Sequence, residues 1–153
     1  LYLEASGSID SENAQFSWMN SDKFYTLTTA TQKDDQVLLT RIGANDPKFN
    51  LRKEPSIILR RPKAKNTLFA SLIEQHGSYS RVSESAFNSN SNVKNLSVRY
   101  EDEKYTAILI EMVNGGSRIF IVSNQNIESS TQHQLKINDK HYSWMGPYHY
   151  VSL

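Results

Sequence analysis

The stretch YTAILIEMVNGGSRIFIVS, residues 105–123, is the strongest indication of a fold in this chain. Two apolar runs, 105–113 and 117–123, flank Asn114 and Gly115. Aromatic and β-branched residues favour strands, and an Asn-Gly pair between two such runs favours a hairpin with a type I′ turn. The sequence therefore predicts a β-hairpin here, with its first strand central in a sheet and buried on both faces.

Similar short runs recur along the rest of the chain, separated by clusters of turn-forming residues. They lack a convincing helical period. We therefore expect one all-β domain over residues 1–153, built as an antiparallel β-sandwich or stacked antiparallel sheets. Residues 32–35 and 138–139 are expected to form hairpin turns. The other strands are expected at residues 1–6, 15–19, 23–30, 36–42, 56–61, 67–76, 95–101, 134–137 and 141–144.

The composition limits the classes of function. Of the 153 residues, 38% are hydrophobic and 22% are charged, which is typical of a globular domain. The net charge of +1 offers no excess of cations to neutralise phosphates, so nucleic acid is not expected as the partner. No apolar run approaches the roughly 18 residues of a transmembrane helix, so no membrane partner is expected. The absence of cysteine excludes disulfides and thiolate chemistry.

A long polar loop is expected at residues 40–52, TRIGANDPKFNLR, where turn-forming residues crowd together. At about a dozen residues it would exceed the usual hairpin connection. Arg41, Asn45 and Arg52 are candidate substrate-binding residues, because a guanidinium matches a carboxylate through two parallel hydrogen bonds. The alternative is that the arginines pair with carboxylates of the protein and hold the loop in place.

A second long loop, residues 77–92, is expected after a strand that ends at His76. Glu74 would project to the same face of that strand as His76, and Glu84 lies in the loop beyond. A histidine with neighbouring carboxylates can ligate a metal or act as an acid–base pair. His76 and Glu84 are therefore candidate metal ligands. The alternative is a histidine at the end of a strand that hydrogen-bonds the adjacent loop.

Histidines and aromatic residues gather in the last part of the chain. Such side chains can stack on sugar rings, but they more often pack at the edge of a sheet, and packing is the interpretation we favour. The standard motifs of serine hydrolases, P-loop nucleotide-binding proteins and zinc proteases do not occur. The residues of the cluster are His133, His141, Tyr142, Trp144, Tyr148, His149 and Tyr150.

Several blocks of the sequence resemble a known family. They are TRIGANDPKFNLR (40–52), EPSIILRR (54–61), TLFASLIEQHGSY (67–79) and VSE (82–84). They resemble the C-terminal β-sheet domain of heparinase II/III-like polysaccharide lyases, and most of all the oligoalginate lyases of polysaccharide lyase family 17. The resemblance implies the later part of that domain, preceded by an α/α toroid, in a bacterial enzyme that is periplasmic or secreted.

The resemblance also implies a reaction, β-elimination on alginate or another uronate polysaccharide. A base removes the C5 proton of a uronate, the bond from C4 to the glycosidic oxygen breaks, and an acid protonates that oxygen. The catalytic groups of relatives lie outside the part that this chain matches, so no catalytic residue is expected here. The resemblance makes Tyr79 and Glu84 candidates for substrate contact, and it also suggests that Glu84 lies near a zinc ion of the complete enzyme. It favours a role for Arg41 and Arg52 in bracing the loop over one in binding substrate.

Three functions remain open from the sequence. The chain is the C-terminal β-sheet part of an alginate-type lyase and contributes support and cleft wall. Alternatively, it is a stand-alone carbohydrate-binding module, whose arginines and aromatic residues hold an acidic polysaccharide. In the third alternative it is a structural or oligomerisation module, for example one that forms a homo-oligomer.

Overall fold

The computed structural model describes residues 2–44 and 52–153, and within these ranges the chain forms strands and no helix. The strands pair antiparallel, which confirms the predicted all-β class. No helix of the described residues is long and apolar enough to span a membrane. The strands are β1 (Tyr2–Ser8), β2 (Asn13–Asn20), β3 (Lys23–Ala30), β4 (Gln36–Ala44), β5 (Arg52–Arg60), β6 (Ser71–Ser80), β7 (Ser85–Phe87), β8 (Val93–Glu101), β9 (Tyr105–Met112), β10 (Ser117–Ser123), β11 (Gln132–Ile137), β12 (Lys140–Met145) and β13 (Tyr148–Ser152).

The chain divides into two compact units. The first comprises residues 1–14 and 31–69, and the second comprises residues 15–30 and 70–153. β3 and β4 belong to different units and to different sheets. The turn predicted at residues 32–35 is present, since the Asp35 amide donates to the Gln32 carbonyl at 3.1 Å, but it joins two strands that do not pair with each other and so makes no hairpin. The single domain expected over residues 1–153 stays a prediction.

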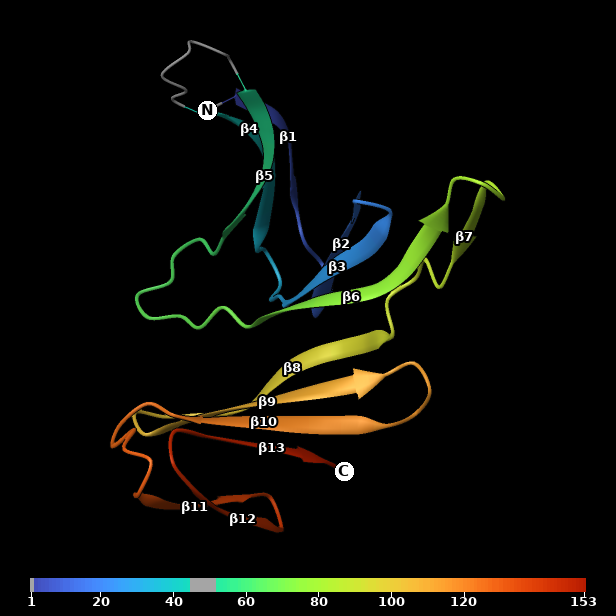
Figure 1. Ribbon diagram of the computed structural model, residues 1–153. Coiled ribbons are helices and arrows are strands. Elements are labelled where there is room, and N and C mark those ends of the chain that lie inside the picture. Colours follow the sequence, from blue (N-terminus) through green and yellow to red (C-terminus); the bar gives the residue numbers. More distant parts are fainter. Residues whose placement is uncertain (1, 45–51) are drawn as a thin grey trace. The chain divides into compact units, whose positions relative to one another are not determined.

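The first unit contains a three-stranded sheet of order β1-β4-β5, which Figure 1 shows as one group. The Asp35 carboxylate accepts two hydrogen bonds from Arg61, from Nε to Oδ1 at 2.8 Å and from Nη2 to Oδ2 at 2.7 Å. Arg61 also donates to the Thr67 hydroxyl and to the Leu68 carbonyl. One guanidinium therefore links the residue before β4 to the segment that follows β5.

The loop predicted at residues 40–52 overlaps the ends of two strands. β4 continues to Ala44 and pairs residue by residue with β5, which begins at Arg52. Only residues 45–51, outside the described ranges, separate the two strands. Pairing with β5 supplies backbone partners for the residues up to Ala44, so Gly43 lies in the ladder rather than in a turn. Pro55 is tolerated in β5 because this strand lies at an edge of the sheet.

The second unit contains three sheets, of orders β2-β3-β6-β7, β13-β10-β9-β8 and β11-β12. β9 lies between β10 and β8, which confirms its predicted central position. Thr106 and Ala107, on opposite faces of β9, are buried, but the strand is only half-buried from Ile108 onward. The prediction that both faces are buried is therefore wrong for most of the strand.

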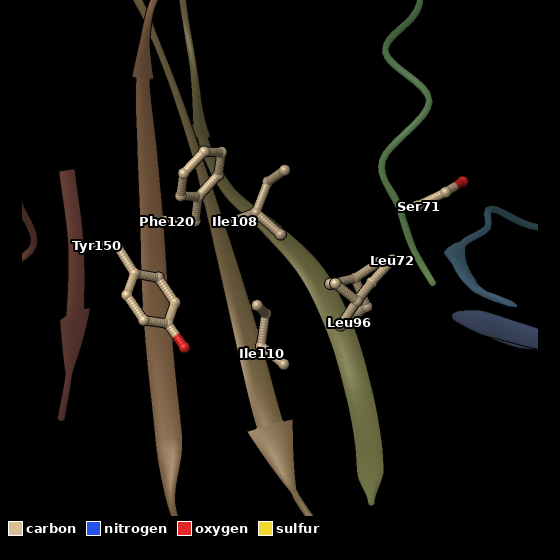
Figure 2. Close-up of a pocket in the computed structure, with 7 residues that line it drawn as sticks. All are labelled: Ser71, Leu72, Leu96, Ile108, Ile110, Phe120 and Tyr150. Atoms are coloured by element: carbon tan, nitrogen blue, oxygen red, sulfur yellow. The ribbon is translucent and has the colours of Figure 1, made fainter. Parts of the chain in front are cut away.

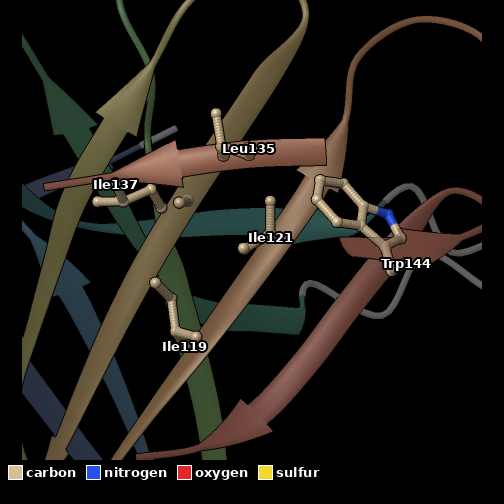
Figure 3. Close-up of a cluster of buried hydrophobic side chains, with 6 residues drawn as sticks. Ile119, Ile121, Leu135, Ile137 and Trp144 are labelled. Atoms are coloured by element: carbon tan, nitrogen blue, oxygen red, sulfur yellow. The ribbon is translucent and has the colours of Figure 1, made fainter. Parts of the chain in front are cut away.

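The apolar core of the second unit lies between the four-stranded sheet of β10 and the β11–β12 hairpin (Figure 3). β11 alternates exposed and buried residues along its whole length, the period expected of a strand with one face inward. The rings of His133 and Trp144 stack with centroids 5.2 Å apart, and His149 stacks on the Trp144 ring at 5.8 Å. This part of the aromatic cluster packs in the core, as we favoured. The core residues are Ala107, Ile119, Ile121, Leu135, Ile137 and Trp144.

The turn of the β9–β10 hairpin differs from the predicted type I′. In this turn Gly115 has a positive φ, 88°, and Asn114 does not. The Gly115 amide donates to the Met112 carbonyl, and the Met112 amide donates to the Gly116 carbonyl. The loop thus has three residues and ends in a left-handed glycine, the next most common hairpin connection. A two-residue turn with both φ values positive occurs instead at Ser21 and Asp22, between β2 and β3.

The sequence analysis did not predict β7 and β13, and it predicted β6 at the wrong residues. β6 begins at Ser71 rather than at residue 67, and it runs through the predicted loop to Ser80, where it pairs with the short β7. β13 follows Pro147 and pairs with β10. The predicted two-residue hairpin at Asn138 and Asp139 is confirmed, since Ile137 pairs with Lys140. Short edge strands lack a strong local pattern in the sequence, because whether they form depends mainly on the strand with which they pair.

Candidate functional site

The residues predicted to bind substrate belong to two different units: Arg41 and Arg52 to the first, and Tyr79 and Glu84 to the second. Arg41 lies on β4, and its Nε donates to Glu4 Oε1 at 2.6 Å in an exposed ion pair. Arg52 is the first residue of β5, opposite Ala44, and Asn45 lies outside the described residues. The pairing of Arg41 with Glu4 agrees with a bracing role, although its partner is on β1 rather than in the loop.

Tyr79 and Glu84 lie near the β6–β7 turn of the second unit. Tyr79 is half-buried, pairs with Ala86, and donates its backbone amide to the Asp22 carbonyl at 2.9 Å. Glu84 is exposed and has a positive φ of 50°, just before β7 begins. Their roles in substrate contact stay predictions.

His76 lies at a β-bulge in β6. The register passes from Phe24 opposite Gly77 to Tyr25 opposite Gln75, so His76 is the extra residue without a partner on β3. Bulges bend a strand and redirect its side chains. The simple alternation that would place Glu74 and His76 on one face therefore does not apply across this point.

Both ring nitrogens of His76 have protein partners. Nδ1 lies 2.8 Å from the Asn88 carbonyl oxygen, which can only accept, so Nδ1 donates. In the neutral ring, Nε2 then accepts from the hydroxyl of Thr26 at 2.9 Å. That hydroxyl lies 2.7 Å from the Ser17 hydroxyl, so a chain of hydrogen bonds links β2, β3 and β6. This geometry is the strand-end histidine that the sequence left as the alternative.

Gly77 makes the contact between His76 and Asn88 possible. A Cβ atom at Gly77 would lie 2.1 Å from the Asn88 carbonyl oxygen and 2.3 Å from the Phe87 carbonyl oxygen. Only glycine lets the backbone after β7 approach β6 this closely. The His-Gly pair in the sequence therefore serves a local packing requirement in the structure.

The Glu74 carboxylate is also held by the protein. It accepts hydrogen bonds from the Ser91 hydroxyl at 2.6 Å, the Asn92 side-chain amide at 2.7 Å and the Asn92 backbone amide at 3.0 Å. Burial alone would raise the pKa of Glu74, but these hydrogen bonds and the nearby His76 hold it below its ordinary value. The hydrogen bonds from Ser91 and Asn92 therefore favour the ionised form of this carboxylate.

The described residues do not fit a metal centre. They contain no group of three or more histidine, aspartate or glutamate side chains that could hold an ion. The His76 nitrogen that a metal would need is already an acceptor for Thr26. Zinc in the complete enzyme stays a prediction, and the residues of this part of the chain supply no evident cage for it.

The structure contains a hollow that the sequence did not indicate, on the face of the β8–β9–β10–β13 sheet opposite the core. Its volume is about 350 Å³, and its lining is almost wholly apolar (Figure 2). Such a surface suits packing against other apolar groups rather than binding a charged sugar. The lining residues are Ser71, Leu72, Leu96, Ile108, Ile110, Phe120 and Tyr150.

A second hollow lies on the other face of the same sheet, beside the turn of the β11–β12 hairpin. It is lined by charged and apolar residues, and Arg99 and Lys140 are among them. The sequence analysis singled out neither residue. The position of Arg99 results from a change in register between β8 and β9. Such a change depends on the partner strand and cannot be recognised in a local stretch of sequence.

Two curated proteins are similar to nearly the whole chain. An exo-oligoalginate lyase of Saccharophagus degradans is 30% identical over 149 residues, which is 95% of this chain and 20% of the lyase. An alginate lyase of Stenotrophomonas maltophilia is 30% identical over 146 residues, 95% of this chain and 19% of that lyase. No protein-family model matches the chain. The chain thus spans about a fifth of the length of these relatives, and it is related to that part of the oligoalginate and alginate lyases, as the resemblance predicted.

Proposed function

We propose that this chain is the C-terminal β-sheet part of a lyase that degrades alginate, or another uronate polysaccharide, by β-elimination. It supplies structural support and part of the wall of the substrate cleft. The observation that carries this proposal is the 30% identity to two alginate-degrading lyases over 95% of the chain. The catalytic groups and an α/α toroid belong to the upstream part of the same enzyme, which is periplasmic or secreted.

The side-chain network around His76 supports a structural role for this chain. Thr26, which is 1% exposed, binds both His76 and Ser17. Glu74 is committed to Ser91 and Asn92. Groups with these partners hold a surface rigid and leave the proton transfers to residues elsewhere in the enzyme.

The proposal is tested by assaying the complete enzyme and this chain alone on alginate. Elimination creates a C4=C5 double bond conjugated to the carboxylate, and its ultraviolet absorbance is the readout. We expect the complete enzyme to form the unsaturated product and the 153-residue chain to form none. Product formed by the chain alone would contradict the expectation that it contains no catalytic residue. A complete enzyme that is inactive on every uronate polymer would overturn the proposed function.

A separate experiment tests Glu84, which is exposed and lies in the turn between β6 and β7. If it faces the cleft or a zinc ion, Glu84→Ala in the complete enzyme lowers turnover or the zinc content measured by atomic absorption. Glu103→Ala, another exposed carboxylate of the second unit, is the matched control. Turnover and zinc content unchanged in both variants would leave Glu84 with a structural role.

A further inference from the structure

The hollow beside the β11–β12 turn has the volume and the mixed lining of a ligand site. Its volume is about 490 Å³, within the range of about 300–1,000 Å³ common for small-molecule sites. Its floor is apolar, formed by Leu109, Ile119 and Ile137. Polar and charged side chains surround this floor, so the hollow differs in character from the apolar one on the opposite face of the sheet.

A β-bulge directs Arg99 into this hollow. In the pairing of β8 with β9, Val98 lies opposite Ile108 and Tyr100 lies opposite Ala107, so Arg99 is the extra residue. Arg99 lines the hollow with Leu109, while the next residue, Tyr100, packs against the core on the same face of the sheet. Two successive residues on one face are possible only because of the bulge, and bulges are enriched next to functional sites.

The β11–β12 turn brings the other polar groups to the rim. Asn138 has a positive φ of 51°, which makes the two-residue connection tight. Asn138, Asp139 and Lys140 all line the hollow, and so does the half-buried ring of Tyr142 on β12. The rim therefore offers two cations, an amide, a carboxylate and an aromatic face.

The two cations are available to a ligand. Within the described ranges, neither Arg99 nor Lys140 makes an ion pair or a side-chain hydrogen bond, in contrast to Arg41, Arg61 and Arg81. Both residues are exposed. An arginine next to an apolar floor, with its guanidinium free, suits a planar anion that it can hold by two hydrogen bonds.

We propose that this hollow binds a uronate unit of an acidic oligosaccharide. Arg99 and Lys140 hold the carboxylate, Tyr142 and the apolar floor contact the sugar ring, and Asn138 and Asp139 bond its hydroxyl groups. The identity of the ligand as a uronate rests on the proposed function, while the preference for a carboxylate over a neutral sugar rests on the rim charges. The site acts as an additional subsite that retains the polymer, because it contains no residue suited to the elimination.

The test is a calorimetric titration of the 153-residue chain with alginate oligomers and with the same oligomers after reduction of their carboxyl groups. Arg99→Gln and Lys140→Gln each remove one charge from the rim. Lys136→Gln on β11 removes the same charge from the same hairpin but does not line the hollow. Far-ultraviolet circular dichroism verifies that each variant retains its strands.

We expect Arg99→Gln and Lys140→Gln each to weaken binding of the uronate oligomer by about tenfold, the value of one charge-assisted hydrogen bond. Lys136→Gln should bind as the unchanged chain does, and the carboxyl-reduced oligomer should bind about tenfold more weakly or not at all. Binding that Lys136→Gln weakens as much as Arg99→Gln does, equal binding of the reduced oligomer, or no binding of any oligomer would overturn the site.

The kinetics of the complete enzyme separate this site from the proposed function. If the subsite exists, Arg99→Gln raises KM for long oligomers about tenfold and leaves kcat unchanged, because the residue does not touch the reacting bond. A complete enzyme that eliminates normally with an unchanged KM in Arg99→Gln would overturn the subsite and leave the proposed function intact. A complete enzyme without elimination activity would overturn the proposed function, whereas charge-dependent binding by the chain would still support the subsite.

Discussion

The two compact units of this chain bury different kinds of side chain. In the first unit, the described residues that are buried are polar, and several apolar side chains of its sheet, such as Leu3 at 60% and Ile42 at 48%, are exposed. In the second unit, nine apolar residues are buried, six of them in one cluster. The first unit therefore depends on directional polar bonds centred on Asp35 and Arg61, and the second on the removal of apolar area from water.

Because of this difference, we expect different kinds of substitution to destabilise the two units. Loss of packing area in the second unit costs free energy in proportion to the cavity that remains. Loss of one partner from the Asp35–Arg61 pair costs more than the pair itself contributes, because an uncompensated charge stays buried. The predictions below separate the two kinds of failure.

The largest effect is expected for Trp144→Ala. Trp144 is 6% exposed and stacks between His133 and His149, so its loss leaves a large cavity in the core cluster. We expect the free energy of unfolding to fall by about 3–5 kcal/mol, measured by urea denaturation followed by circular dichroism. Met145→Ala, at a residue that is 58% exposed, should cost less than about 0.5 kcal/mol. Hydrogen exchange that accelerated equally in β4 and in β10 would contradict a separate core.

Arg61→Gln should destabilise the first unit. The variant leaves the buried Asp35 carboxylate without its two guanidinium hydrogen bonds, and we expect a loss of about 3 kcal/mol. Amide hydrogen exchange in β4 and β5 should accelerate more than in β9 and β10. Arg41→Gln is the control, because the ion pair of Arg41 with Glu4 is exposed and its loss should cost less than about 1 kcal/mol. Equal effects of the two arginine variants would refute the central role of Arg61.

Gly77→Ala should show that the second unit also depends on one polar contact. The new Cβ would overlap the Asn88 and Phe87 carbonyl oxygens, so the backbone must move and the bond from His76 to Asn88 must lengthen. We expect a cost of about 2 kcal/mol, measured as a shift of the urea midpoint. Gly7→Ala is the matched control, since a Cβ there meets no atom within 4 Å. The prediction fails if both alanine variants are equally stable.

The smallest effect is expected on acidification. Hydrogen bonds from Arg61 hold the pKa of the Asp35 carboxyl below its ordinary value of 3.8, although burial opposes them. A lowered folded pKa means that this contribution is complete above about pH 3.8 and is lost as pH falls through the lower, folded value. Urea denaturation at pH 7 and below pH 3.8 should therefore show a loss that Asp35→Asn reduces.

Glu74 has a lowered pKa as well, so acid also weakens the second unit. For this reason the informative quantity is the difference between the unchanged chain and Asp35→Asn at each pH. Asp34→Asn, next in the sequence and exposed, serves as the control. An identical pH dependence of stability in the two asparagine variants would show that Asp35 does not cause the loss of stability in acid.

The sequence predicted local features better than long-range ones. The β9–β10 and β11–β12 hairpins were found because apolar runs and turn residues lie next to each other in the chain. β13 was missed, because its place beside β10 depends on a partner about 30 residues earlier. β4 and β5 were cut short because Gly43 and Pro55, which suggest turns locally, are accommodated in a ladder at the edge of the sheet.

The candidate site shows the same division. The sequence indicated His76 as a residue of interest and left open whether it is a metal ligand, part of an acid–base pair or a structural histidine. Its partners, Thr26 on β3 and Asn88 after β7, are 50 and 12 residues away, so only the folded chain could identify them. Arg99 carried no signal at all, because a single arginine within an expected strand is ordinary on a protein surface.

The sequence by itself determined the all-β class, the β9–β10 and β11–β12 hairpins and the relationship to alginate-degrading lyases. These depend on alternation, turn chemistry and residue identity, which are properties of neighbouring positions. Only the tertiary structure decided the bulges at His76 and Arg99 and the burial of Asp35 beneath Arg61. A bulge exists only relative to a partner strand, and burial exists only relative to the rest of the chain, so neither can be read from a local stretch of sequence.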